Sequence, residues 1–193
     1  MRLKQYNLTI SPEKCAFFKS SVVYLGHVLS ADGIKADPAK TSVIRDFKKP
    51  TTLKELRSFL GITSYYRKFC KNFAEIANPL TELTKGYAIG KGNKINITDK
   101  WGILQDKAFG ELKRILEEDV VLAFPDFDKP FKLSTDASAH TIGGVLSQED
   151  PITGRDKPIT FFSRRLNNAE RNYEILSKEA LGIIFGLKYN RIY

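Results

Sequence analysis

The chain has 193 residues, enough for one ordinary domain or two small ones with a buried core. Its composition, 42% hydrophobic and 27% charged, excludes a wholly disordered protein. No apolar run approaches the roughly 18 residues of a membrane helix, and the N-terminus lacks a signal peptide's apolar core, so we expect no membrane partner. Cys15 and Cys70 lie far apart, which is typical of reduced thiols in an intracellular protein of the cytoplasm or nucleus.

The net charge of +9 is unevenly distributed along the chain. Residues 1–100 hold 18 Lys/Arg against 8 Asp/Glu, whereas residues 101–193 hold 13 against 14. A basic, aromatic-rich first half joined to a nearly neutral second half indicates a module that binds a polyanion. A solvated basic face without a partner explains the charge equally well.

The first predicted elements are strands. Residues 17–30 are rich in β-branched and aromatic side chains. They predict a strand, a tight turn at Ser20-Ser21 and a second strand, followed by a turn at residues 31–33 into Ile34 and Lys35. Together these form a small β-ribbon or hairpin.

Two helices follow with recognisable starts. Asp37 followed by Pro38 predicts an N-cap and a first helical turn. Thr52 and Glu55 have the spacing of a capping box at the start of a second helix, and Gly61 is a plausible end for it.

Apolar and aromatic residues between positions 65 and 83 predict a third helix, which Pro79 bends or ends. We expect the three helices to share one small core. Residues 85–100 are rich in glycine and lysine and predict a linker, and residues 101–116 predict an amphipathic helix.

The last 65 residues change character. Residues 131–136 alternate, with Phe131, Leu133 and Thr135 between Lys132, Ser134 and Asp136, and this pattern predicts a strand that ends at an aspartate. Residues 142–147 and 159–163 predict two more strands, with a turn at residues 151–155 between them. A long helix is predicted to follow over Tyr173–Tyr189, with its buried side formed by Leu176, Ala180, Leu181, Ile184 and Leu187.

Two carboxylates are candidates for chemistry. Asp136 ends a half-buried strand, where aspartate is disfavoured, and small residues follow it. Taken alone, a turn-forming aspartate explains this position better. Glu179 lies in the middle of the last helix beside its apolar stripe. A strand carboxylate and a helix carboxylate can converge on a divalent cation such as Mg²⁺, although spacing alone does not establish that they do.

A run of aromatic and basic residues at positions 65–69 is typical of surfaces that bind nucleic acid. At helical spacing most of these aromatic side chains belong to a core instead. We expect Arg67, Lys68 and Lys71 on the exposed side, where they can face phosphates.

Several motifs, in this order, resemble the Pol polyproteins of Ty3/gypsy-type retrotransposons. The first group resembles the end of the polymerase palm: KCAFF at residues 14–18, YLGHVLS at 24–30 and GIKADPAK at 33–40. The second resembles the thumb: KELRSFLG at 54–61, YYRKF at 65–69, NFA at 72–74 and PLT at 79–81. The third resembles the start of ribonuclease H: FPDF at 124–127, KPF at 129–131, TDAS at 135–138, GVLSQ at 144–148, NY at 172–173 and KEAL at 178–181.

The resemblance implies roles for individual residues. The segment containing Tyr24, Leu25, Gly26 and His27 would be the primer grip, a hairpin that positions the primer's 3′ end. The basic helices would hold the template–primer duplex or RNA–DNA hybrid through phosphate contacts, which implies nucleic-acid-binding roles for Lys54, Arg57, Arg67, Lys68 and Lys71.

In the second half of the chain, Asp136 and Glu179 would be catalytic carboxylates of ribonuclease H. The family site holds two Mg²⁺ ions that activate a water and stabilise the leaving oxygen. The rest of the Pol polyprotein would be a further partner.

The resemblance also implies limits. The family's activities are RNA-directed DNA synthesis and cleavage of RNA in hybrids, but these residues contain no Tyr-x-Asp-Asp polymerase motif and only two of the ribonuclease H carboxylates. Ser177 and Ile97 depart from residues common in the family. We therefore expect an enzyme by family whose isolated chain is inactive.

The predicted fold is α+β, with a β-hairpin and a helical thumb bundle before a partial ribonuclease H-like fold of three antiparallel strands and a helix. The predicted boundaries are 1–36 for the palm end, 37–84 for the thumb, 85–128 for linker and connection helix, and 129–193 for the ribonuclease H-like part. The alternatives are a non-catalytic nucleic-acid-binding remnant or domesticated interaction protein, and a chain that does not fold stably because a strand edge is exposed.

Overall fold

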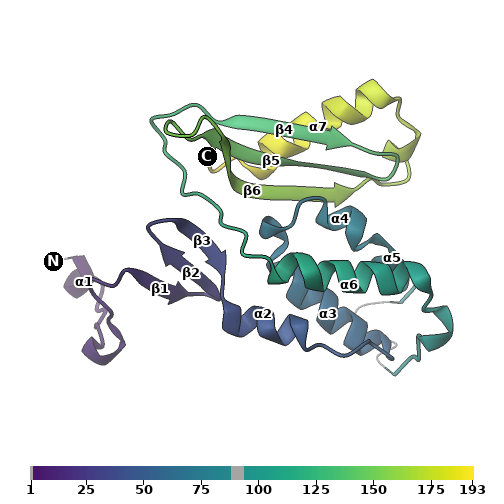
Figure 1. The fold of residues 1–193 in the computed structure, drawn as a ribbon, viewed down its shortest axis with the longest axis horizontal. Helices are drawn as coiled ribbons and strands as arrows, with labels where there is room; N and C mark the ends of the chain where they lie inside the picture. The colour runs from purple at the N-terminus through teal and green to yellow at the C-terminus, as the bar shows by residue number, and fades with distance from the viewer. Residues whose placement is uncertain (1, 88–93) are drawn as a thin grey trace.

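The computed structural model describes residues 2–87 and 94–193 and shows two sheets and a layer of helices (Figure 1). In the sequence, the helices of this layer come after the first sheet and before the second. The first part contains α1 (Arg2–Gln5), η1 (Pro12–Lys14), β1 (Ser21–Tyr24), β2 (His27–Ser30) and β3 (Gly33–Ala36). The helical layer contains α2 (Pro38–Arg45), α3 (Leu53–Tyr65), η2 (Arg67–Phe69), α4 (Phe73–Ile76), α5 (Asn78–Glu82), η3 (Thr98–Lys100) and α6 (Ile103–Glu117). The last part contains β4 (Lys132–Ala137), β5 (Thr141–Glu149), β6 (Asp156–Arg165), η4 (Glu170–Asn172) and α7 (Ile175–Tyr189).

Both sheets are antiparallel with neighbouring strands in chain order, β1-β2-β3 and β4-β5-β6. Together with the helices they confirm the predicted α+β fold class. Across residues 2–87 and 94–193, no helix has the length and apolar character needed to cross a membrane.

The first sheet differs from the predicted hairpin in its turn and its size. The tight turn lies at Leu25-Gly26, between β1 and β2, whereas the predicted turn at Ser20-Ser21 immediately precedes and opens β1. Leu25 and Gly26 have φ angles of 47° and 72°, the left-handed backbone of a two-residue hairpin turn. Such turns match the twist of the flanking strands, and Gly26 adopts this conformation without strain. A third strand, β3, then pairs with β2.

The two predicted helix starts are confirmed. The Asp37 carboxylate accepts a hydrogen bond from the backbone N–H of Ala39 at 3.0 Å. At the start of α3, Thr52 Oγ1 accepts from the N–H of Glu55 at 3.3 Å, and Glu55 Oε2 accepts from the N–H of Thr52 at 3.2 Å. The predicted end at Gly61 is wrong, because α3 continues to Tyr65 and buries Thr63 beyond the glycine.

The third predicted helix is replaced by three short pieces, η2, α4 and α5. Asn72 interrupts the pattern with a φ of 57°, which no helix accommodates. Pro79 lies in the first turn of α5, where its missing N–H has no helical partner to lose. It therefore opens a helix instead of ending one, and the aromatic periodicity reflects a shared core.

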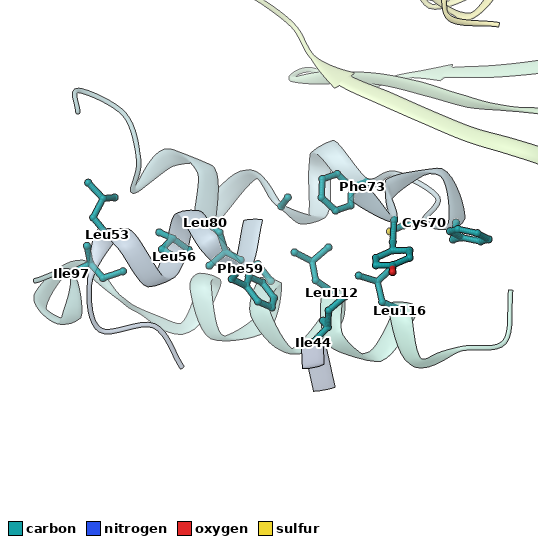
Figure 2. Close-up of a cluster of buried hydrophobic side chains, with 14 of the residues drawn as sticks. Ile44, Leu53, Leu56, Phe59, Cys70, Phe73, Leu80, Ile97, Leu112 and Leu116 are labelled. Carbon is teal, nitrogen blue, oxygen red and sulfur yellow. The ribbon is translucent and has the colours of Figure 1, made fainter. Parts of the chain in front are cut away.

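That core extends beyond the predicted thumb to α6, whose buried residues pack with those of α2, α3 and α5 (Figure 2). The predicted linker also contributes, since Ile97 is 1% exposed and its N–H donates to the carbonyl of Thr51 at 2.9 Å. Residues 88–93 of that linker lie outside the described residues. The largest fully buried side chains of the core are Ile44, Leu53, Leu56, Phe59, Leu80, Ile97, Leu112 and Leu122.

The three strands and the final helix predicted for the second half are confirmed, with the turn at residues 151–155 between β5 and β6. The predicted buried side of α7 is wrong. Leu176 and Leu187 are 77% and 61% exposed, whereas Gly182 and Gly186 are buried against the sheet. The helix backbone approaches so closely that a Cβ on Gly186 would lie 2.9 Å from Cζ of Phe162.

Candidate nucleic-acid interface and carboxylate pair

The two candidate carboxylates come from β4 and α7. Asp136 is exposed and opposite Gly143 of β5, and Glu179 is half-buried. Neither side chain forms a hydrogen bond or ion pair with another residue among 2–87 and 94–193. Both oxygen pairs are therefore free to accept a ligand.

The packing register brings the two residues to the same end of β4. Gly182 lies against the Thr135 side chain and Gly186 against Leu133, so α7 runs antiparallel to β4. Four helical residues rise about 6 Å, close to the rise of two strand residues. Glu179, one turn before Gly182, is thus level with Asp136. Strand alternation places Asp136 on the face opposite Thr135, so the carboxylates approach this end from the two faces of the sheet.

Carboxylate oxygens are the donors that Mg²⁺ prefers, so both residue types fit this ion. The described residues nevertheless contain no group of three or more His, Cys, Asp or Glu side chains that could hold a metal ion. Two carboxylates are an incomplete ligand set, and no catalytic step through a metal follows from them alone.

The predicted primer-grip residues form the β1–β2 turn. Tyr24 and Leu25 are exposed, and Gly26 and His27 are half-buried. His27 Nδ1 lies 2.8 Å from the carbonyl oxygen of Leu25. Burial lowers the pKa of His27, and the nearby Lys68 ammonium lowers it further. The His27 ring centroid lies 5.4–5.8 Å from the ring centroids of Tyr65, Tyr66 and Phe69.

The thumb lysines differ in their surroundings. Lys54 and Lys71 are exposed and belong to no ion pair among the described residues, so both ammonium groups are available to phosphates. Lys68 is half-buried with its ammonium 5.2 Å from the centroid of the Phe69 ring, and burial lowers its pKa. Arg57 is less available than the sequence suggested, because its guanidinium donates to the carbonyl of Tyr87 at 2.8 Å.

Arg67 faces the second sheet, where the sequence predicted an exposed side chain directed at phosphate. Its guanidinium donates to the carbonyl oxygen of Ser163 on β6 and lies 5.6 Å from the centroid of the Phe73 ring. The Ala74 N–H donates to Ser163 Oγ at 2.9 Å. Arg67 therefore joins the helical layer to the sheet.

The exposed face of α3 was not predicted from the sequence. Ser58 and Gly61 lie there at helical spacing, with Lys54 at one end and Tyr65 at the other. A Cβ added at Gly61 would meet no atom within 4 Å. The only sign of this face in the sequence is the spacing of Lys54, Ser58, Gly61 and Tyr65 by three or four residues. This spacing is also typical of an ordinary solvent-exposed helix face.

The contacts of the adjacent tyrosines, Tyr65 and Tyr66, were not predicted either. The hydroxyl of Tyr65 donates to the carbonyl of Leu25, and that of Tyr66 donates to the carbonyl of Gly26 at 3.2 Å. Beside these bonds, a cavity of about 560 Å³ lies between the turn and helices α2 and α3. Sequence reasoning assigned both rings to a helical core, because nothing local indicates a hydroxyl partner 40 residues away.

Comparison with known proteins places these features in a family. The family described as "RNase H-like domain found in reverse transcriptase" matches residues 101–193. The retrovirus-related Pol polyproteins from the Drosophila melanogaster transposons opus and gypsy are 48% and 46% identical over 99% and 94% of this chain. The Tf2-3 transposon polyprotein of Schizosaccharomyces pombe is 34% identical over the whole chain. The chain spans 19%, 17% and 14% of the lengths of these relatives.

Solved structures give the same result. The foamy viral protease-reverse transcriptase dRH in complex with double-stranded DNA is 27% identical, with a TM-score of 0.78 over 97% of this chain and 31% of that one. The foamy viral protease-reverse transcriptase in complex with an RNA/DNA hybrid has a TM-score of 0.76 over 92% of this chain and 23% of that one. These matches do not favour the alternative of a non-catalytic nucleic-acid-binding remnant or domesticated interaction protein. The chain belongs to the retrotransposon Pol polyproteins and corresponds to a segment of them that carries the reverse-transcriptase-associated RNase H-like domain.

Proposed function

We propose that this segment binds a nucleic-acid duplex, either a template–primer or an RNA–DNA hybrid, with the exposed face of α3 and the β1–β2 turn. The observation that carries the proposal is the small-residue face of α3, where Ser58 and Gly61 lie between Lys54 and Tyr65. Glycine inside a helix costs about 1 kcal/mol relative to alanine, so local stability does not explain Gly61.

A face without long side chains lets a rod-shaped ligand approach the helix axis closely, and Lys54 supplies positive charge at its edge. The charge of the first half of the chain agrees with a polyanionic ligand. The structural relatives described above are complexes with double-stranded DNA and with a hybrid, which supports the same class of ligand.

We further propose that Asp136 and Glu179 serve as carboxylate ligands of a Mg²⁺-dependent ribonuclease H site. Their common level at one end of β4 and their freedom from other partners support this role, although they reach that end from opposite faces of the sheet. A two-metal site supplies an activated water and stabilises the leaving oxygen. The isolated chain would not cleave a hybrid, because its described residues give two carboxylates and no third ligand. Mg²⁺-dependent cutting by the purified chain that Asp136→Asn abolishes would overturn this expectation.

The binding proposal is tested with Gly61→Leu. The added side chain enters open space, so the fold persists, but it occupies the face where the duplex would lie. Fluorescence anisotropy with a labelled RNA–DNA hybrid should show an affinity at least about tenfold lower, equivalent to roughly 1.4 kcal/mol.

Gly110→Leu is the matched control, because Gly110 is an exposed glycine of α6 with no atom within 4 Å of an added Cβ. It should bind like the wild-type chain. Equal affinities for both variants, with both folded by circular dichroism, would remove the α3 face from the interface.

A further inference from the structure

Residues 94–97, which the sequence predicted as part of a linker, are fixed on the start of α3. The Leu53 N–H donates to the carbonyl of Ile95 at 2.9 Å. The Ile97 N–H donates to the carbonyl of Thr51, also at 2.9 Å. Ile97 is 1% exposed and lies beside Leu53 in the core (Figure 2). The backbone of this segment is therefore held in place, and the side chains that it carries keep a fixed position relative to α3.

This pairing brings Lys94 close to Lys54. Lys94 directly precedes Ile95 and Lys54 directly follows Leu53, so the two lysines adjoin the two ends of one backbone hydrogen bond. Both side chains are exposed, and neither forms an ion pair within residues 2–87 and 94–193. Like charges on neighbouring segments repel one another in the free chain, so local stability does not explain this arrangement.

Two further cations lie one helical turn along α3, on either side of Tyr87. The Arg57 guanidinium donates to the Tyr87 carbonyl at 2.8 Å. The Lys100 ammonium donates to the Tyr87 hydroxyl at 3.2 Å, and its other two N–H groups remain for a ligand. Arg57 is three residues from Lys54, a spacing that makes the two side chains neighbours on the helix surface. Tyr87 thus connects Lys100 to the same end of α3.

Few carboxylates oppose these charges. Asp99 is the only acidic residue of segment 94–100. Glu55 is directed at the backbone, because its Oε2 accepts from the N–H groups of Thr51 and Thr52 at 2.8 and 3.2 Å. The start of α3 therefore carries a net positive patch, and a polyanion would relieve its internal repulsion. The cations of this patch are Lys54, Arg57, Lys94 and Lys100.

We propose that Lys94 and Lys100 contact phosphates of the duplex that lies on α3, so that the binding surface continues past the start of this helix onto residues 94–100. The inference rests on the proposed duplex binding and extends its surface to a segment outside the motifs that carry the family resemblance. Phosphates recur along both strands of any duplex, so these lysines add affinity without reading the base sequence.

The double variant Lys94→Gln/Lys100→Gln tests this surface. Glutamine suits both exposed positions and can still donate to the Tyr87 hydroxyl, so the fold should persist. Anisotropy titrations with a labelled RNA–DNA hybrid would be repeated at several salt concentrations. The slope of the logarithm of affinity against the logarithm of salt concentration should be smaller by about two, because each lost phosphate contact lowers it by about one. Between roughly 50 and 200 mM salt, the wild-type affinity should fall about tenfold more than that of the variant.

Lys107→Gln/Lys188→Gln is the matched control. These lysines of α6 and α7 are exposed and form no ion pair within residues 2–87 and 94–193. The control removes the same charge from the chain as a whole, so it should keep the wild-type slope if the position of the lysines matters. Removal of the repulsion between Lys94 and Lys54 should also leave the first double variant at least as stable as the wild-type chain to thermal unfolding.

The failures are distinguishable. A wild-type chain that does not bind the hybrid at low salt contradicts the proposed function itself. A Lys94→Gln/Lys100→Gln variant with the wild-type slope, or with a slope no smaller than that of the control variant, leaves duplex binding intact. Either of these results overturns the contact of residues 94–100 with phosphate.

Discussion

The helical layer and the β4–β6 sheet bury their helices by different means. Helix α6 packs through large side chains, with Leu112 and Leu116 no more than 4% exposed. Helix α7 packs through Gly182 and Gly186, and Leu176 and Leu187 are on its exposed side. Both helices have an apolar stripe in the sequence, but the stripe is buried in α6, whereas two glycines are the buried residues of α7. An apolar stripe alone therefore does not identify the buried side of a helix when small residues on another side allow the backbone to pack closely against a sheet.

The strongest test of this contrast is the same substitution in both helices. Leu112→Ala leaves a cavity in a closed core and should lower the free energy of unfolding by about 2–5 kcal/mol. Leu187→Ala on the exposed side of α7 should change it by less than about 0.5 kcal/mol. Urea unfolding measures both values. Similar losses in the two variants would mean that the outer face of α7 is covered in solution.

A second test substitutes alanine for one glycine in each helix, and the two substitutions should change the free energy of unfolding in opposite directions. Gly186→Ala places a Cβ 2.9 Å from Phe162 and 3.1 Å from Leu133, so it should destabilise the chain by about 1–3 kcal/mol. Gly110→Ala in α6 adds a methyl group in open space and should stabilise by up to about 1 kcal/mol. Thermal unfolding separates the two, and stabilisation by Gly186→Ala would contradict the close contact of α7 with the sheet.

The contact of Arg67 with Ser163, between the helical layer and the β4–β6 sheet, is expected to contribute less to the free energy of unfolding. Arg67→Met keeps most of the side-chain volume and removes the donor to the Ser163 carbonyl. We expect a loss of about 1–2 kcal/mol, and a melting curve in which the layers unfold in separate steps. Lys71→Met, which removes an exposed charge, is the control. A single unchanged transition in Arg67→Met would show that other contacts hold the layers together.

The smallest expected effect is a dependence of the free energy of unfolding on pH, caused by His27. The pKa of His27 is lowered from 6.5 by burial and by Lys68, so the folded chain binds fewer protons here than the unfolded one. The stability contributed by neutral His27 is present above pH 6.5 and is lost as the pH falls through and below that value. The chain should thus be less stable at pH 5.5 than at pH 7.5, and His27→Phe should reduce this difference.

The sequence predicted local features well where the signal is local. The caps at Asp37 and Thr52 and the strand ending near Asp136 depend on neighbouring residues, and the structure confirms all three. The stop at Gly61 failed because burial of Thr63 favours continuing the helix, a consequence of packing that no local pattern contains.

The candidate site divides in the same way. Asp136 and Glu179 were recognised from their residue types and their places in the predicted strand and helix. That both lie at the same end of β4 depends on how Gly182 and Gly186 pack against that strand, which the sequence does not show. Arg67 and the two tyrosine hydroxyls bond to partners 40 or more residues away. Such pairs follow from tertiary structure, which is why a basic-aromatic run alone could not assign them.

The most direct test of the central claim is a titration of the purified chain with a labelled RNA–DNA hybrid at several salt concentrations. If the exposed lysines and the turn bind the duplex, the logarithm of the affinity should fall linearly with the logarithm of salt concentration, by about 0.9 per phosphate neutralised. Lys54→Ala should lower that slope by about one. Absent binding at low salt, or affinity independent of salt, would contradict the assignment of this surface to nucleic acid.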